Sequence, residues 1–141
     1  MNIKKLFLLL LTCVAIVATI SAKNTWKKGT AEWMKIQIHE NFTYDKAFNT
    51  VLDLITDKYE MDLISKDGGY IRTAWSFMKN AKGKKIKNMR VRITAKFNHD
   101  RTQLQVRTEV QKLKKDDQWI DGEDINLSRQ IRDDIQGVLG L

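Results

Sequence analysis

The chain has 141 residues, a formal net charge of +8 at pH 7, one cysteine and no proline. This length suits a single domain with one modest core. A lone cysteine excludes a fold stabilised by intrachain disulfides. The two histidines, His39 and His99, lack the H-x-x-x-H and H-E-x-x-H spacings of zinc sites, so we predict no metal site.

The first 22 residues have the three parts of a secretory signal peptide. A basic start, MNIKK, precedes an uncharged apolar run from Leu6 to Ile20 and the small residues Ser21 and Ala22. We therefore predict cleavage after Ala22 and export to the periplasm or cell envelope. An uncleaved anchor is the alternative, although the apolar run is shorter than the 18 or more residues of a spanning helix.

A lipid anchor at Cys13 is a further alternative for the same segment. Leu10-Leu11-Thr12-Cys13 has the outline of a bacterial lipoprotein box. Thr12 is a poor residue to precede a lipidated cysteine, and the apolar run continues to Ile20. We therefore favour cleavage, which leaves residues 23–32 as a short tether and residues 33–141 as a single domain.

The first elements of that domain are a strand and a helix. Met34–Ile38 alternates apolar and polar residues, the pattern of a half-buried strand. Thr43 is a suitable N-cap, and Asp45 stands in the first turn, where the helix dipole favours a negative charge. The helix has one apolar face, because its apolar residues recur at steps of three and four: Phe48, Val51, Leu52, Ile55 and Tyr59.

Four strands and a second helix follow. Residues 61–65 and 70–78 predict a hairpin whose turn holds Asp67-Gly68-Gly69, residues that tolerate positive φ. Residues 89–97 and 104–110 alternate in the same way, with a turn between them. Asp124 or Asn126 then begins a helix with one apolar stripe. The predicted order is β-α-β-β-β-β-α, an α+β fold with an antiparallel sheet and both helices on one face.

Alternation assigns the strand residues to two faces of this sheet. The face under the helices is expected to bury Ile71, Trp75, Phe77, Val91, Ile93, Phe97, Val106 and Val110. The other face is expected to be open and cationic, and it is our candidate partner-binding face: Tyr70, Arg72, Arg90, Arg92, Lys96 and Arg107.

The positive charge is concentrated in one part of the chain, because no acidic residue occurs between Asp67 and Asp100. Such asymmetry indicates a surface that faces an anionic partner, either an envelope protein or an anionic membrane surface. The alternative is that these arginines only keep the sheet soluble and pair with Glu109. The sequence does not indicate an oligomeric state.

We find no catalytic motif and expect neither enzymatic activity nor a cofactor. No serine lies in a G-x-S-x-G setting. The acidic run from Asp116 to Asp124 lacks the ligand spacing of an EF-hand and is predicted to be a solvated loop before the last helix. A nucleic-acid partner is not expected, because Trp75 and Phe77 would face the core, away from the arginines, and because export removes the chain from nucleic acid.

Two segments, YDKAFNTVLDLITDKYEMDLISKDGGYIRTAW and MRVRITAKFNHDRTQLQVRTEVQ, carry a family resemblance. Their spacing resembles the helix-grip domains of the bacterial envelope lipoprotein family typified by BamC (NlpB), over roughly residues 33–139. The resemblance implies a non-enzymatic accessory of outer-membrane assembly that binds other proteins. The residues that match the short motif of the family are Asp67, Gly69, Tyr70, Ile71, Thr73 and Trp75.

The functional expectation is therefore an exported binding or scaffold domain of the cell envelope. The alternative is a carrier that holds a lipid or another apolar ligand between the first helix and the sheet. A cavity at that place would favour the carrier, since ligand sites are concave and mostly apolar. A filled core would favour the binding domain.

Overall fold

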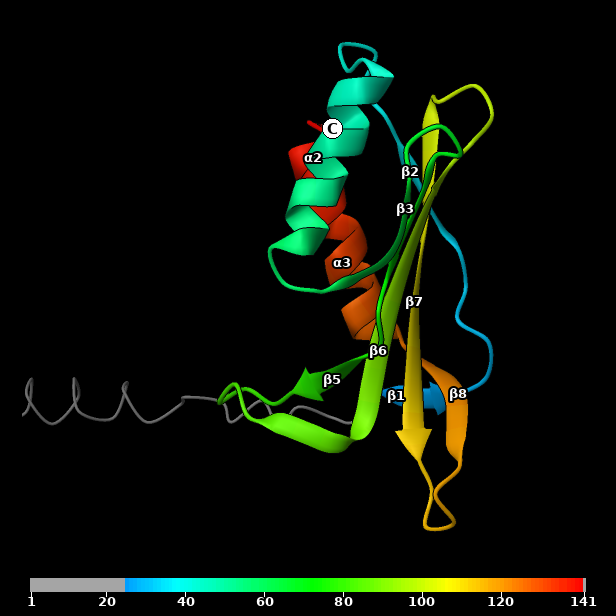
Figure 1. The fold of residues 1–141 in the computed structure, drawn as a ribbon, viewed down its shortest axis with the longest axis vertical. Helices are drawn as coiled ribbons and strands as arrows, with labels where there is room; N and C mark the ends of the chain where they lie inside the picture. Colours follow the sequence, from blue (N-terminus) through cyan, green and yellow to red (C-terminus); the bar gives the residue numbers. More distant parts are fainter. Residues whose placement is uncertain (1–24, 141) are drawn as a thin grey trace, which may run out of the picture.

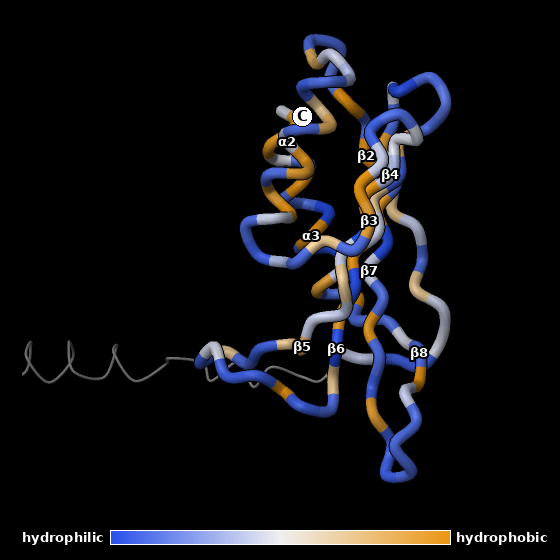
Figure 2. The backbone as a smooth tube through the Cα atoms, viewed as in Figure 1, coloured by the Kyte–Doolittle hydropathy of each residue, from blue (hydrophilic) through white to orange (hydrophobic). Residues whose placement is uncertain are grey.

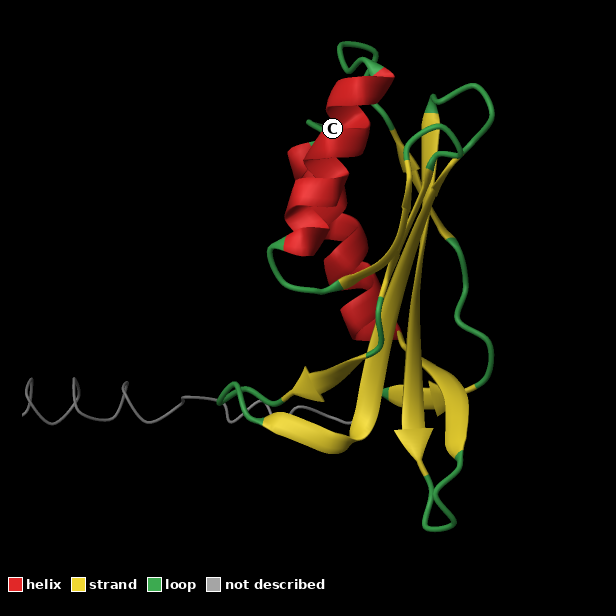
Figure 3. Cartoon of the chain, in the orientation of Figure 1, coloured by secondary structure: helices red, strands yellow, loops and turns green. Residues whose placement is uncertain are grey.

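A computed structural model describes residues 25–140, which form an eight-stranded antiparallel sheet with two helices on one side (Figures 1 and 3). The α+β class and this arrangement of sheet and helices are as predicted. The predicted signal peptide, residues 1–22 with Cys13, lies outside the described residues. The elements in chain order are β1 (Trp26–Lys28), β2 (Met34–Gln37), α2 (Tyr44–Thr56), β3 (Met61–Ser65), β4 (Tyr70–Thr73), β5 (Ser76–Lys79), β6 (Lys85–Phe97), β7 (Gln103–Leu113), β8 (Trp119–Asp124) and α3 (Ile125–Val138).

Two strands occur where the sequence pattern does not predict them. Strand β1 lies inside the segment 23–32, for which we expected a tether, and it pairs antiparallel with β8. Strand β8 occupies most of the predicted acidic loop and pairs with the end of β7. Both strands are short and their hydrophobic alternation is weak, so only the pairing with β7 and with each other defines them.

The long hairpin of β6 and β7 is the centre of the sheet. Its pairing runs without a break from Met89 opposite Lys112 to Phe97 opposite Leu104. The outer edge of β6 pairs with β4 near one end and with β5 near the other. The edge of β7 that faces away from β6 pairs with β2 at the start of β7 and with β8 at its end. The hairpin thus carries one group of strands beside the helices and a second group beyond their ends (Figure 1).

Both helices begin at capping residues. The Oγ1 atom of Thr43 accepts a hydrogen bond from the backbone N–H of Lys46 at 3.3 Å, as expected for the N-cap of α2. For α3, the carboxylate of Asp124 accepts from the N–H groups of Asn126 and Leu127, each at 3.1 Å. Asp124, the first of the two predicted starts, is therefore the N-cap.

The core lies between the helices and the sheet. Apolar and polar residues alternate along β6 and β7 (Figure 2). Most of the apolar ones are buried and form the core face of the sheet. The α2 residues Phe48, Val51 and Ile55 are buried against that face. Six of the eight predicted core residues are buried: Ile71, Val91, Ile93, Phe97, Val106 and Val110.

Trp75 and Phe77 contradict the prediction, because they lie on the opposite face of the sheet. Ile71 pairs with Ala95 and Ser76 pairs with Val91, so five steps along β4 and β5 match only four steps along β6. One extra residue at Ala74–Trp75 forms a bulge, and a shift of one residue moves every following side chain to the other face. The predicted strand 70–78 is therefore two strands, and Phe77 is 45% exposed.

Thr73 holds the sheet together just before the bulge. It is fully buried, and its Oγ1 accepts a hydrogen bond from the backbone N–H of Ile93 at 3.0 Å. The hydroxyl of Thr73 thus takes the place of the backbone carbonyl that would accept this hydrogen bond in regular strand pairing. Thr94 is equally buried on the neighbouring position of β6, but its Oγ1 has no hydrogen-bond partner among the described residues.

These two threonines provide a matched test of the hydrogen bond. Thr73→Val should lower the free energy of unfolding by about 1–3 kcal/mol, because it leaves the buried N–H of Ile93 without an acceptor. Thr94→Val removes a hydroxyl without such a partner and should change the stability little or raise it. Urea unfolding of both variants measures the difference, and equal losses would contradict the role of Thr73.

The position of Trp75 can be tested by comparing its truncation with that of Phe97, a buried aromatic residue of the core. Phe97→Ala should lower the free energy of unfolding by about 3–5 kcal/mol, as is usual for a buried aromatic. Trp75→Ala should cost only about 1–2 kcal/mol, since it removes a half-buried ring and its contacts with two arginines. A loss for Trp75→Ala as large as that for Phe97→Ala would place Trp75 in the core.

Candidate functional site

The six predicted residues of the candidate face lie together on the helix-free side of the sheet. Tyr70 pairs with Lys96 across β4 and β6, and Arg72 pairs with Thr94. Thr94 in turn pairs with Arg107 of β7. Residues that stand opposite each other project to the same face, so the register brings all six to one surface. Arg90 and Arg92 join them by alternation along β6.

The arginines of this face are not freely solvated, which corrects the expectation of an open cationic surface. Arg72 donates from Nε to Asp62 at 2.8 Å and forms an ion pair with it at 2.6 Å. The hydrogen bond to Asp62 is the main reason why the pKa of Arg72 is raised. Arg90, Arg92 and Arg107 are half-buried. Lys96, by contrast, is exposed.

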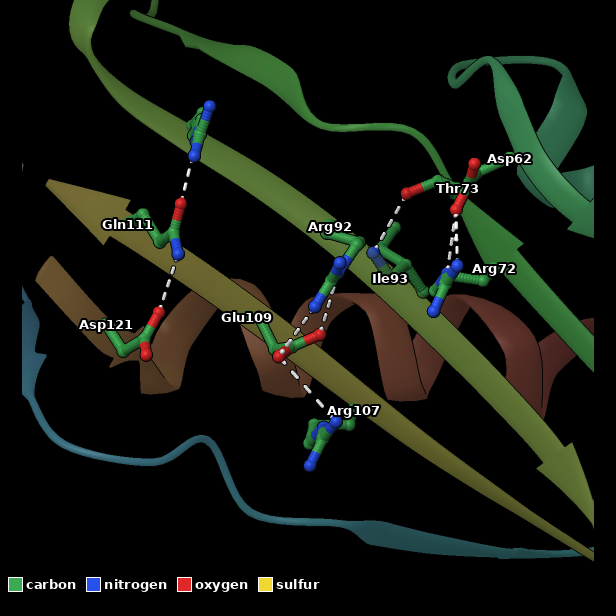
Figure 4. A network of polar contacts seen from close by, with 10 residues as sticks. Asp62, Arg72, Thr73, Arg92, Ile93, Arg107, Glu109, Gln111 and Asp121 are labelled. Atoms are coloured by element: carbon green, nitrogen blue, oxygen red, sulfur yellow. Dashed lines mark hydrogen bonds and ion pairs between the residues drawn. The ribbon is translucent and has the colours of Figure 1, made fainter. Parts of the chain in front are cut away.

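Glu109 of β7 joins two of these arginines (Figure 4). Arg92 donates to both of its carboxylate oxygens, from Nε at 3.0 Å and from a terminal nitrogen at 3.2 Å. A terminal nitrogen of Arg107 approaches the same carboxylate at 3.6 Å. The three side chains are 22–27% exposed. Two-point contact with a carboxylate fixes the plane of the Arg92 guanidinium.

Arg90 lies between two tryptophan rings. Its guanidinium carbon is 4.1 Å from the ring centroid of Trp119 and 4.8 Å from that of Trp75. Its Nε donates to Gln111 at 2.7 Å, and Gln111 donates to Asp121 at 2.6 Å. Burial lowers the pKa of Arg90, and the positive charge of Arg92 lowers it further, whereas Asp121 raises it. An arginine keeps its charge under such conditions, so the rings enclose a cation.

These contacts continue in a row across the sheet. Arg92 lies 4.5 Å from the ring centroid of Trp75, and Arg107 lies 4.6 Å from that of Trp33. We call the row the tryptophan–arginine ladder. Its members, in spatial order, are Trp119, Arg90, Trp75, Arg92, Glu109, Arg107 and Trp33.

The sequence pattern identifies the arginines of the ladder but not its tryptophans. Trp75 is assigned to the wrong face because of the bulge. Trp33 precedes β2 and Trp119 begins β8, a strand that is not predicted. The sequence signal for such a ladder would be arginines and tryptophans on the same face of neighbouring strands. That signal can be recognised only after it is known which strands pair.

The cavities bear on the carrier hypothesis. Between α2, α3 and the sheet, the space beside Ile55 and Ile93 amounts to 160 Å³, below the range of about 300–1,000 Å³ for ligand pockets. A larger cleft of 670 Å³ lies beyond the end of α2, between the α2–β3 turn and β5. Its apolar lining includes Tyr59, Met78 and Leu127.

Neither a metal cluster nor a membrane-spanning helix occurs in the part of the chain that the structure describes. Between residues 25 and 140, no group of three or more His, Cys, Asp or Glu side chains could hold a metal ion. None of the helices in this part of the chain is long and apolar enough to cross a membrane.

Comparison with known proteins adds no assignment. No protein-family model matches the chain, and no curated protein matches it. The ladder and the cleft are therefore interpreted from their own chemistry.

The role of Glu109 in the ladder can be measured. Glu109→Gln should lower the free energy of unfolding by about 1–2 kcal/mol, because it weakens charge-assisted hydrogen bonds in a partly buried site. Glu40→Gln, at an exposed loop position, is the control and should change stability by less than about 0.5 kcal/mol. Thermal or urea unfolding measures both. A neutral effect of Glu109→Gln would mean that the ladder is not held by its carboxylate.

Proposed function

We propose that this chain is a non-enzymatic, exported binding or scaffold domain of the cell envelope, and that it binds a partner protein through the tryptophan–arginine ladder. The observation that carries the proposal is the ladder itself. Three tryptophans and three arginines gather on the face that no helix of the described residues covers.

The composition of the ladder is that of a protein interface. Tryptophan, tyrosine and arginine are the residues most enriched among those that dominate binding energy. Arg90 and Arg92 are stacked and hydrogen-bonded, and Arg107 is stacked on Trp33 and ion-paired with Glu109. Little side-chain entropy therefore remains to be lost when a partner binds. Exposed aromatic surface is available at and beside the ladder: its terminal member Trp33 is 38% exposed, and Phe77, which pairs with Arg90, is 45% exposed.

The charge of the face suits a partner that is acidic overall. The ladder and its surroundings hold five cations, those of Arg72, Lys96 and the three ladder arginines. Among the described residues, three carboxylates lie beside them, from Asp62, Glu109 and Asp121. Excess positive charge would steer an acidic protein to the face and orient it there.

The envelope location rests on the signal peptide expected at residues 1–22. The resemblance to BamC-like helix-grip domains supports the same place, and it points to a role as an accessory of outer-membrane assembly. A shared fold alone does not fix a function, so this finer role depends on the partner.

The expectation that the partner is not a nucleic acid now rests on export. Trp75 and Phe77 lie on the same face as the arginines, so the argument that stacking rings and cations are on opposite faces is wrong. A chain that enters the envelope is separated from nucleic acid, and we therefore propose a protein.

A carrier of an apolar ligand is the second candidate, and the 670 Å³ cleft favours it. The cleft differs from the site expected for a carrier, because it lies beyond the end of α2 and not between α2 and the sheet. It is large enough for a small apolar ligand.

Affinity capture of the tagged protein from its native envelope tests the proposal. Trp33→Ser combined with Phe77→Ser should reduce the recovered partner more than tenfold, because both rings extend the ladder surface. Ile64→Ser combined with Val138→Ser is the matched control, since these residues are similarly exposed, at 48% and 37%. Ile64 pairs with the core residue Ile71 and Val138 lies on α3, so neither belongs to the ladder face. The control should recover as much partner as the wild type.

Three results would contradict the binding role of the ladder. They are equal recovery by the ladder variant, equal losses in both variants, or an apolar small molecule that co-purifies in place of a protein. The last result would favour the carrier. Urea unfolding of both variants confirms that each is folded, because substitutions at exposed positions usually change stability by less than about 0.5 kcal/mol.

A further inference from the structure

A second surface of different chemistry lies where β1, β7 and β8 meet. Trp26 of β1, Leu113 of β7 and Ile120 of β8 line a shallow hollow of 390 Å³. All three are half-buried, so each leaves part of its apolar surface accessible. The rim of the hollow is formed by four lysines, and we call the whole surface the lysine-rimmed patch: Lys28, Lys112, Lys114 and Lys115.

The lysines of this patch can contact an anionic partner directly, because they are not engaged in ion pairs as two of the ladder arginines are. None of the ion pairs among residues 25–140 involves one of them. Lys28, Lys114 and Lys115 are exposed. Lys112 is the exception, because its Nζ lies 5.5 Å from the ring centroid of Trp26. Asp116 and Asp117 follow Lys115 in the turn between β7 and β8.

We infer that the lysine-rimmed patch is a contact site for an anionic phospholipid surface. An apolar centre with a tryptophan and a rim of lysines matches the boundary between acyl chains and headgroups. Tryptophan rings prefer that boundary, and long lysine side chains reach from an apolar surface to charged groups above it. Each lysine close to an anionic bilayer adds to the attraction.

The position of the chain entry favours a membrane as the occupant. The described chain begins at Thr25, directly before Trp26 of the patch. The apolar run of the signal segment ends at Ile20, only six residues earlier. Six residues span at most about 20 Å. While that run is in the membrane, the patch is therefore held within this distance of the bilayer, and after cleavage the patch can keep the protein there.

This site is independent of the tryptophan–arginine ladder. The patch lies at β1 and the end of the β7–β8 hairpin, and it shares no residue with the ladder. A protein partner on the ladder and a lipid surface at the patch can be bound at the same time. Failure of partner binding at the ladder would leave the lipid contact standing. The closeness of the chain entry to a bilayer, however, depends on the export that the proposed function assumes.

Co-sedimentation with vesicles tests the inference. The protein from Lys23 onward is used, because it contains both core clusters and every described strand and helix. It should sediment with vesicles of phosphatidylcholine and phosphatidylglycerol, should not sediment with phosphatidylcholine alone, and should be released by salt, since exposed charges are screened over about 8–10 Å at physiological ionic strength.

Two charge-matched variants locate the contact. Lys114→Gln with Lys115→Gln should weaken partitioning by about 10- to 30-fold, as expected when two lysines leave an anionic surface. Lys82→Gln with Lys84→Gln removes the same charge from the exposed turn between β5 and β6 and should bind like the wild type. Equal losses in both variants, a loss only in the second, or no binding to either vesicle would overturn the inference.

A fluorescent label gives a second measurement that does not depend on those variants. Cys13 is the only cysteine and is not part of this protein form, so Lys115→Cys and Lys82→Cys each provide a single attachment site. An environment-sensitive label at position 115 should shift to the blue when phosphatidylglycerol vesicles are added, whereas one at position 82 should not. A shift only at position 82 would place the contact on the other turn.

Discussion

The continuous pairing of β6 with β7 is the interaction on which the rest of the structure depends. Every other strand of the sheet is attached to this hairpin, directly or through one neighbour. Its alternation also separates the two faces: Val91, Ile93 and Val106 face the core, and Arg90, Arg92 and Arg107 face away. Since the side-chain period of a strand is two, a slip of one residue in this hairpin would exchange the core with the functional face. The register therefore determines the core and the site together.

The bulge at Ala74–Trp75 breaks this rule, and the tryptophan–arginine ladder is its consequence. Without the extra residue, Trp75 would enter the core and Arg90 and Arg92 would lose the ring between them. A bulge ordinarily removes one backbone hydrogen bond between the two paired strands. Here the hydroxyl of Thr73 supplies an acceptor for Ile93 at the same point. Bulges commonly re-aim a side chain beside a functional site, and this geometry is of that kind.

The chain uses arginine and lysine for different purposes. The ladder arginines lie on the face of the sheet, where their planar guanidinium groups stack on tryptophan rings and pair with a carboxylate. Such groups are held rigidly and suit a shaped partner. The lysines of the lysine-rimmed patch include Lys114 and Lys115, which are exposed at the end of the β7–β8 hairpin, where their charge is hydrated. A diffuse negative surface needs no fixed geometry, so the two kinds of cation fit the two contacts proposed for them.

The sequence by itself determined the α+β class, both helices, the cap of α2 at Thr43, and most of the core, and it narrowed the start of α3 to Asp124 or Asn126. These features are local: capping, helical periodicity and strand alternation act within a few residues. It also determined that the arginines share one face, because β6 and β7 alternate without interruption. Tertiary structure alone decided the rest. Strands β1 and β8 form only because they pair with segments that are distant in the sequence. The face to which Trp75 projects depends on the one-residue shift in register between the β4–β6 and β5–β6 pairs. The contacts of Trp33 and Trp119 join residues far apart in the chain, and the lysine-rimmed patch needs β1 beside β8, so only the folded sheet brings them together. The pairing of the arginines with Glu109, in contrast, was one of the alternatives that the sequence offered.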